Sequence, residues 1–198
     1  MKTAFWVAAG LLALTNIASA AEKGDWSFRA GPYTVNPESS NGDLVRVDDA
    51  VSLGFDFTYF YSQNWAIEVL ASTPFTHDIS LIDGTAVGET KHLPPTLSLQ
   101  YHFSTEGSFH PYIGAGLNYT LFFDEKTQGP LAGAKLELDG SFGLAAQLGA
   151  VVDINDNWFV NAEVRYIQIE SDAKLDGVVV TKAEINPLVA GITLGYRF

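Results

Sequence analysis

The chain has 198 residues, which is the size of one domain, and a formal net charge of -12. It contains no cysteine, so disulfides and thiolate metal sites are excluded. Its acidity argues against nucleic acid as a partner, because phosphate binding needs a basic face. The hydrophobic share of 47% is ordinary for a soluble protein, so composition alone does not place the chain in water or in a membrane.

The first twenty residues have the pattern of a secretory signal peptide. Lys2 supplies the positive charge, the apolar run AFWVAAGLLAL extends from Ala4 to Leu14, and Ala18-Ser19-Ala20 is a small-residue cleavage site. A membrane-spanning helix needs about 20 apolar residues, and this run is roughly half as long. We therefore expect residues 1–20 to be removed and residues 21–198 to form one domain.

Beyond residue 20, apolar residues occupy every second position in eight runs along the chain. A period of two is typical of strands with one apolar face. The runs lie at residues 26–30, 51–59, 65–71, 97–103, 113–123, 142–152, 158–166 and 188–198.

The residues between these apolar positions distinguish a membrane barrel from a water-soluble one. A soluble sandwich or a lipocalin-type barrel needs an outer face rich in charge. Here the second face carries small or uncharged residues, such as Gly114, Gly116, Asn118 and Gln147, with only sparse charges. Such residues suit a narrow barrel interior, so the large apolar set should face lipid. We predict an all-β transmembrane barrel in the outer membrane of a Gram-negative bacterium, in contact with lipid and lipopolysaccharide.

The connections between the runs alternate strictly between long and short. Long ones lie near 35–50, 76–92, 124–140 and 171–184, and short ones at 62–64, 104–110 and 154–157. This alternation predicts an eight-stranded antiparallel up-and-down barrel with both termini in the periplasm, four long extracellular loops and three short periplasmic turns. Aromatic residues gather near the short turns and should form a girdle at that membrane interface. They are Trp26, Tyr59, Phe60, Tyr61, Trp65, Tyr101, Phe103, Tyr112, Trp158, Tyr196 and Phe198.

The inward positions divide the lumen into two halves. The periplasmic half receives charges of both signs, which should pair as a polar plug, because an unpaired buried charge is costly. Its residues are Arg29, Asp56, Glu68, Gln100, Glu163 and Arg165. The extracellular half receives apolar residues, which either form a pocket for a hydrophobic ligand or only pack the interior of a small barrel. These are Tyr33, Leu70, Pro74, Phe122, Ile167 and Ile169.

Two prolines interrupt the extracellular start of the fourth strand. Pro94 and Pro95 lie opposite residues 72–75. Proline cannot donate a hydrogen bond to a strand ladder, so pairing should break locally there. The break is either a lateral seam, which opens from the lumen into the membrane, or simply the end of the strand above the membrane.

Residue types that carry catalysis or bind metals give no convincing set. His77 and His92 flank the second long loop, but solvated loop histidines are commoner than metal ligands, and no third ligand occurs at a telling spacing. No Ser-His-Asp set can be assigned to one rim. We therefore expect no metal, no cofactor and no enzymatic activity, and we expect a monomer.

The chain ends on INPLVAGITLGYRF, in mid-alternation, with the aromatic Phe198 as its last residue. This ending resembles the C-terminal signal that outer-membrane barrels present to their assembly machinery, which makes that machinery an expected partner. Four further stretches are distinctive: LGFDFTYF from Leu53, STPFTHDI from Ser72, KHLPPTLSLQYHF from Lys91 and HPYIGAGLNYTLFFDE from His110. These stretches resemble the outer-membrane protein W family.

The resemblance implies an eight-stranded outer-membrane barrel whose lumen admits small hydrophobic molecules from outside and releases them sideways into the membrane. The residues themselves leave two functions open. One is this conduit for small hydrophobic ligands. The other is a structural or adhesive barrel that acts through its acidic extracellular loops, with a lumen that is only packed.

Overall fold

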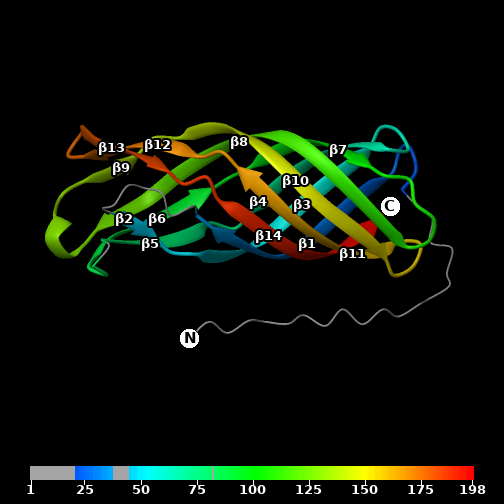
Figure 1. The fold of residues 1–198 in the computed structure, drawn as a ribbon, viewed down its shortest axis with the longest axis horizontal. Helices are drawn as coiled ribbons and strands as arrows, with labels where there is room; N and C mark the ends of the chain where they lie inside the picture. Colours follow the sequence, from blue (N-terminus) through cyan, green and yellow to red (C-terminus); the bar gives the residue numbers. More distant parts are fainter. Residues whose placement is uncertain (1–20, 38–44, 82) are drawn as a thin grey trace.

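The computed structural model describes residues 21–37, 45–81 and 83–198 (Figure 1), so the predicted signal peptide lies outside the described residues. Eight antiparallel strands form a closed ring. They are β1 (Trp26–Asn36), β3 (Ala50–Phe60), β4 (Trp65–Ser72), β7 (Thr96–His102), β8 (Phe109–Thr127), β10 (Ser141–Asp153), β11 (Trp158–Ile167) and β14 (Leu188–Arg197). The ring closes through the pairing of β14 with β1. The predicted eight-stranded up-and-down barrel is confirmed.

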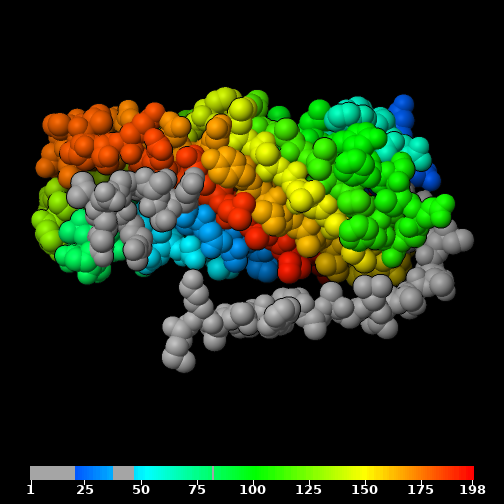
Figure 2. Space-filling view, in the orientation of Figure 1, coloured from blue at the N-terminus to red at the C-terminus, as the bar shows by residue number. Residues whose placement is uncertain are grey.

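Ring closure suits a membrane, because lipid offers no partners for backbone N–H and C=O groups at a free sheet edge. Large apolar side chains on the outer surface are exposed, among them Phe57, Leu148 and Ile192. Along β4 the buried residues include Glu68 and Leu70, which face the lumen. Figure 2 shows β14, β11 and β10 as diagonal bands across one face, which is the strand tilt expected of a barrel.

Two members of the predicted aromatic girdle belong inside the barrel instead. Phe60 is 4% exposed and Tyr112 is fully buried. Both rings pack against His102, with centroid distances of 4.9 Å and 4.8 Å. The girdle prediction is wrong for these two residues because it grouped aromatic residues by their distance from the turns. Their even-numbered positions on β3 and β8 turn them inward.

The long connections contain further strands, where the sequence suggested loops. These strands are β2 (Val45–Val47), β5 (Phe75–Leu81), β6 (Ala86–Leu93), β9 (Leu136–Leu138), β12 (Glu170–Leu175) and β13 (Val178–Glu184), with a 3₁₀ helix, η1, at Gly129–Leu131. β8 continues from the barrel into this extension and pairs first with β7 and then with β6. A separate sheet has the order β13-β12-β9. The barrel wall therefore continues past the eight-stranded ring at one end (Figure 1).

The three short turns, at 61–64, 103–108 and 154–157, lie at the opposite end, which we call the short-turn end. Trp26 and Phe198 meet there through two backbone hydrogen bonds, with N–O distances of 3.0 and 2.9 Å. The Phe198 side chain is exposed. Its role in assembly stays a prediction. Among the described residues, no helix is long and apolar enough to cross a membrane.

Candidate functional site

The lumen near the short-turn end is crossed by five charged side chains. Arg29 comes from β1, Asp56 from β3, Glu68 from β4, and Glu163 and Arg165 from β11. Arg165 Nη2 lies 2.7 Å from Glu68 Oε1 and 2.9 Å from Glu163 Oε1. Arg29 contacts Glu68, and its Nη2 lies 2.8 Å from Glu163 Oε2. Because β4 and β11 are four strands apart in a ring of eight, the Arg165–Glu68 pair spans the lumen.

Uncharged donors complete this network, which we call the polar plug. Gln100 Nε2 donates to Glu68 Oε2 at 2.5 Å, the Tyr112 hydroxyl donates to Glu163 Oε2 at 2.7 Å, and the Tyr33 hydroxyl donates to Asp56 Oδ2 at 2.7 Å. The structure thus brings all six predicted plug residues together. Sequence reasoning missed the two tyrosine hydroxyls. Their inward positions at the same level as the acids were the signal that pointed to them.

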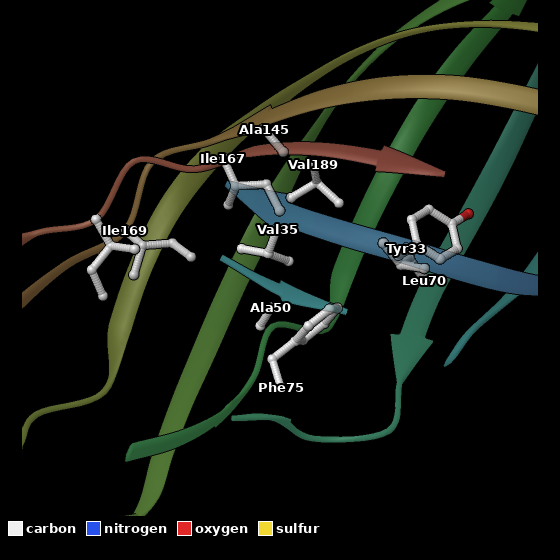
Figure 3. Packing of buried hydrophobic residues seen from close by; sticks show 10 residues of the cluster. Tyr33, Val35, Ala50, Leu70, Phe75, Ala145, Ile167, Ile169 and Val189 are labelled. Atoms are coloured by element: carbon white, nitrogen blue, oxygen red, sulfur yellow. The ribbon is translucent and has the colours of Figure 1, made fainter. Parts of the chain in front are cut away.

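Apolar side chains fill the lumen on the other side of the plug (Figure 3). Phe122 is partly buried and packs against this apolar cluster. The cluster itself consists of Tyr33, Val35, Ala50, Leu70, Phe75, Ala145, Ile167, Ile169, Ile185 and Val189. Of the six residues predicted for the extracellular half of the lumen, which we call the upper lumen, five therefore lie together.

The sixth predicted residue, Pro74, is exposed, and its assignment to the lumen is wrong. β4 ends at Ser72, and the strand resumes at Phe75 as β5. Buried residues fall on even numbers in β4 and on odd numbers in β5, because the interruption shifts the alternation by one residue. Phe75, which is 2% exposed, takes the inward position instead.

A cleft of about 210 Å³ lies among the extension strands at the long-loop end. Aliphatic side chains dominate its lining, including Ile79 on β5, Val87 on β6 and Leu136 on β9. A second cavity, of about 140 Å³, lies at the short-turn end, where Arg29 and Gln100 of the plug form part of its lining. The plug therefore borders this second cavity, on the side away from the apolar cluster.

His77 and His92 lie near the apolar cluster, where they are buried rather than solvated as expected. Their rings stack at a centroid distance of 4.9 Å and an interplanar angle of 16°. Burial is the main cause that lowers the pKa of both side chains, and the pKa of His92 falls to about 3. The prediction of solvated histidines is therefore wrong. The described residues include no group of three or more His, Cys, Asp or Glu side chains placed to hold a metal ion.

Strand pairing is interrupted beside Pro94 and Pro95. On one side of the interruption Leu70 pairs with Thr96, and on the other Phe75 pairs with His92. The residues between them, 71–74 and 93–95, do not pair with each other in these two ladders. The opposite edge stays attached to β8, since Tyr119 N donates to the Pro95 carbonyl at 3.1 Å. Pairing is therefore lost toward residues 71–74 and kept toward β8.

A hydrogen-bonded row at the short-turn end was missed by sequence reasoning. Thr105 Oγ1 lies 3.0 Å from His110 Nδ1, His110 Nε2 lies 2.9 Å from Asp153 Oδ2, and Arg197 Nη2 lies 3.2 Å from Asp153 Oδ1. The Thr105 hydroxyl donates to the Phe109 carbonyl at 2.5 Å, so it is tied to the backbone. The row joins β8, β10 and β14, and strand register rather than sequence spacing brings its members together.

A closed eight-stranded ring with an apolar outer face, a charged plug and an apolar upper lumen defines a small transmembrane barrel of the bacterial outer membrane. Comparison with known proteins narrows this class. The model of the OmpW family matches residues 22–198, and the chain belongs to that family. It is a protein of the outer membrane of Gram-negative bacteria.

Outer membrane protein W of Vibrio cholerae is 42% identical, and the alignment covers 96% of this chain and 97% of that protein. The crystal structure of the outer membrane protein OprG from Pseudomonas aeruginosa is similar with a TM-score of 0.80 and 33% identity, covering 92% of this chain and 99% of that one. A third relative, the dibenzothiophene metabolism operon protein PahQ of Pseudomonas aeruginosa, is 28% identical over 90% of each chain.

Proposed function

We propose that this protein is a passive conduit through which small hydrophobic molecules cross the outer surface of the cell and enter the outer membrane. The single observation that carries the proposal is the division of one lumen into an apolar half and a charged half. A hydrophobic molecule is accepted by the apolar half. It is stopped by the plug, where Arg165 and Glu68 from opposite walls are paired.

The proposed path begins at the long-loop end, which we assign to the outside because long loops are extracellular in this class of barrel. The apolar cleft there supports an entry site. The molecule then reaches the apolar cluster around Leu70, Phe75 and Phe122. The name of the relative PahQ refers to dibenzothiophene, a hydrophobic aromatic compound, which supports the same ligand class.

The proposed exit is lateral, through the lateral seam beside Pro94 and Pro95. Strand pairing is already interrupted there, so an opening costs fewer backbone hydrogen bonds than elsewhere in the wall. The seam lies close to the apolar cluster, since Leu70 and Phe75 stand at its two ends. A ligand held in the cluster would therefore leave into lipid without crossing the plug.

The test is uptake of a small fluorescent apolar probe by cells that lack the protein. The cells are complemented with wild type or with Leu70→Asp/Phe122→Asp at matched outer-membrane levels. We expect wild type to speed uptake and the double variant to lose most of that increase. Two carboxylates in the upper lumen disfavour binding of an apolar molecule, because binding would remove water from the charged groups. The matched control is Val178→Asp/Val179→Asp, which places the same two charges on exposed positions of β13.

If wild type and cells without the protein take up the probe equally, the conduit proposal fails. The alternative, a structural or adhesive barrel that acts through its long-loop end, then becomes the better explanation. In that case the Val178→Asp/Val179→Asp variant is the informative one, since β13 is an edge strand of the extension and both valines are exposed.

A further inference from the structure

Three buried polar side chains lie between the cleft and the apolar cluster. His77 lies on β5, and Thr90 and His92 lie on β6. His77 pairs directly with Thr90 across the two strands, and His92 pairs with Phe75. All three are at most 5% exposed and face inward from the same surface of the hairpin.

Aromatic rings hold the two imidazoles in place. His92 stacks on His77 at 4.9 Å and on Phe75 at 5.3 Å, and its ring also contacts Phe122 at 5.9 Å. Phe75 and Phe122 belong to the apolar cluster, whereas Thr90 lines the cleft. The polar group therefore lies where the cleft meets the apolar cluster.

The hydrogen bond between His77 and the Asp48 carbonyl shows which ring nitrogen of His77 carries the proton. Its Nδ1 lies 2.6 Å from the Asp48 carbonyl oxygen, which can only accept, so Nδ1 carries the hydrogen. In a neutral ring Nε2 is then an acceptor. Within the described part of the chain, His77 Nε2, His92 Nε2 and Thr90 Oγ1 are buried without a hydrogen-bond partner. Buried polar atoms in folded proteins nearly always have hydrogen-bond partners, so we expect a further molecule to form hydrogen bonds with these three atoms.

The two imidazoles act as neutral groups at physiological pH. Asp48, Asp49 and Asp78 lie near His77 and favour its protonation, but burial outweighs them and lowers its pKa. The pKa of His92 is lowered by burial and by the neighbouring His77. A cationic ring pair would attract anions. Neutral rings instead offer a lone pair to a neutral donor.

We infer that His77, Thr90 and His92 form a selectivity site that accepts a hydrogen bond from a hydrophobic ligand. The site favours hydrophobic molecules with one O–H or N–H group over hydrocarbons of the same shape. This inference rests on the proposed conduit and narrows its substrate class. One net hydrogen bond corresponds to a preference of about five- to tenfold.

The experiment compares 1-naphthol with 1-methylnaphthalene, which match in shape but differ in the hydroxyl. Their dissociation constants are measured for the protein in lipid nanodiscs, each corrected for partition into empty nanodiscs. We expect wild type to bind 1-naphthol about five- to tenfold more tightly. In His77→Phe/His92→Phe, which keeps the stacked rings and removes the nitrogens, the ratio should fall to about one, the value expected when no hydrogen bond distinguishes the probes.

A second pair of variants tests the Thr90 hydroxyl with a single substitution. Thr90→Val should lower the ratio, whereas Thr76→Val, on the exposed face of β5, should keep the wild-type ratio. A measurement on wild type alone guards against misfolded variants. With ¹⁵N-labelled histidine, the unprotonated Nε2 resonance of His77 should move on addition of 1-naphthol and stay in place with 1-methylnaphthalene.

Failure of the selectivity site and failure of the conduit would give different results. If wild type binds both probes with equal affinity and the Nε2 resonance of His77 does not respond to 1-naphthol, the selectivity site is refuted and water serves these atoms, while the conduit stands. If neither probe binds above the empty-nanodisc level, the conduit itself is refuted, and the selectivity site falls with it.

Discussion

The two halves of the lumen are built by the same alternation on the same strands, yet they differ in how their side chains are held. In the plug, the single carboxylate of Glu68 accepts three hydrogen bonds, from Arg29, Gln100 and Arg165. In the apolar cluster, contacts such as those of Leu70 and Ile167 have no fixed direction. A network of directional bonds resists a guest, whereas an apolar cluster can rearrange around one. In the proposed conduit, the plug is therefore the barrier and the apolar cluster is the part of the lumen that receives the ligand.

Tyr33 connects the two halves. Its ring belongs to the apolar cluster, and its hydroxyl reaches Asp56 in the plug. The ring passes between Gly54 and Gly191, where an added Cβ would lie 2.2 and 2.3 Å from ring carbons. Glycine at these two positions leaves the space that the ring needs. The position of Tyr33 between the two halves thus requires glycine at residues 54 and 191.

The largest expected effect comes from breaking the plug. Glu68→Ala removes one of the two carboxylates that Arg29 and Arg165 share, the other being Glu163, and we expect a loss of about 3–5 kcal/mol in the free energy of unfolding. Urea unfolding in lipid vesicles measures it. The matched control is Glu170→Ala, which removes the exposed Glu170–Lys182 pair and should cost less than about 1 kcal/mol. Equal losses in both variants would contradict the contrast between the halves.

A smaller effect is expected at the boundary. Gly191→Ala forces the Tyr33 ring away from its position, which should cost about 1–3 kcal/mol by overpacking. The same unfolding assay measures this loss. In a Tyr33→Leu background the substitution should cost much less, because the ring it meets is gone. An unchanged cost in that background would show that the strain arises from the backbone instead.

Acid should weaken the apolar half. His92 has a pKa of about 3 in the fold and an ordinary value of 6.5 when unfolded, so the unfolded chain binds a proton first as the pH falls. Stability from this group is complete above pH 6.5 and declines below it, by about 1 kcal/mol between pH 7 and 5.5. Unfolding at the two pH values measures the decline. His92→Phe should reduce it, and an identical pH dependence in that variant would contradict the assignment.

The smallest effect on stability, but a clear one on flux, is expected at the seam. Pro94→Thr/Pro95→Thr restores two backbone donors and should leave stability unchanged or slightly higher. Probe uptake should fall severalfold if the seam is the exit. Pro130→Thr in η1, an exposed proline outside the seam, is the matched control. Unchanged uptake in the seam variant would refute lateral exit there.

Sequence reasoning was most reliable where lipid and lumen impose opposite demands on neighbouring residues. The eight barrel strands, their short turns and the six plug residues follow from that alternation. It was less reliable in the extension. There burial alternates over only part of β5, β6 and β12 and not along β13, and an interruption near Pro74 shifts the alternation by one residue. The burial of His77 and His92 was missed for the same reason.

By itself the sequence determined that the chain makes a closed barrel with a charged lower and an apolar upper lumen, because a period of two is a local property of each strand. Only the tertiary structure decided that Arg165 reaches Glu68 across the lumen, that Tyr33 passes between two glycines, and that two histidines stack beside Phe75. These contacts join residues far apart in the chain, and their geometry depends on strand register and on barrel closure, which no single strand encodes.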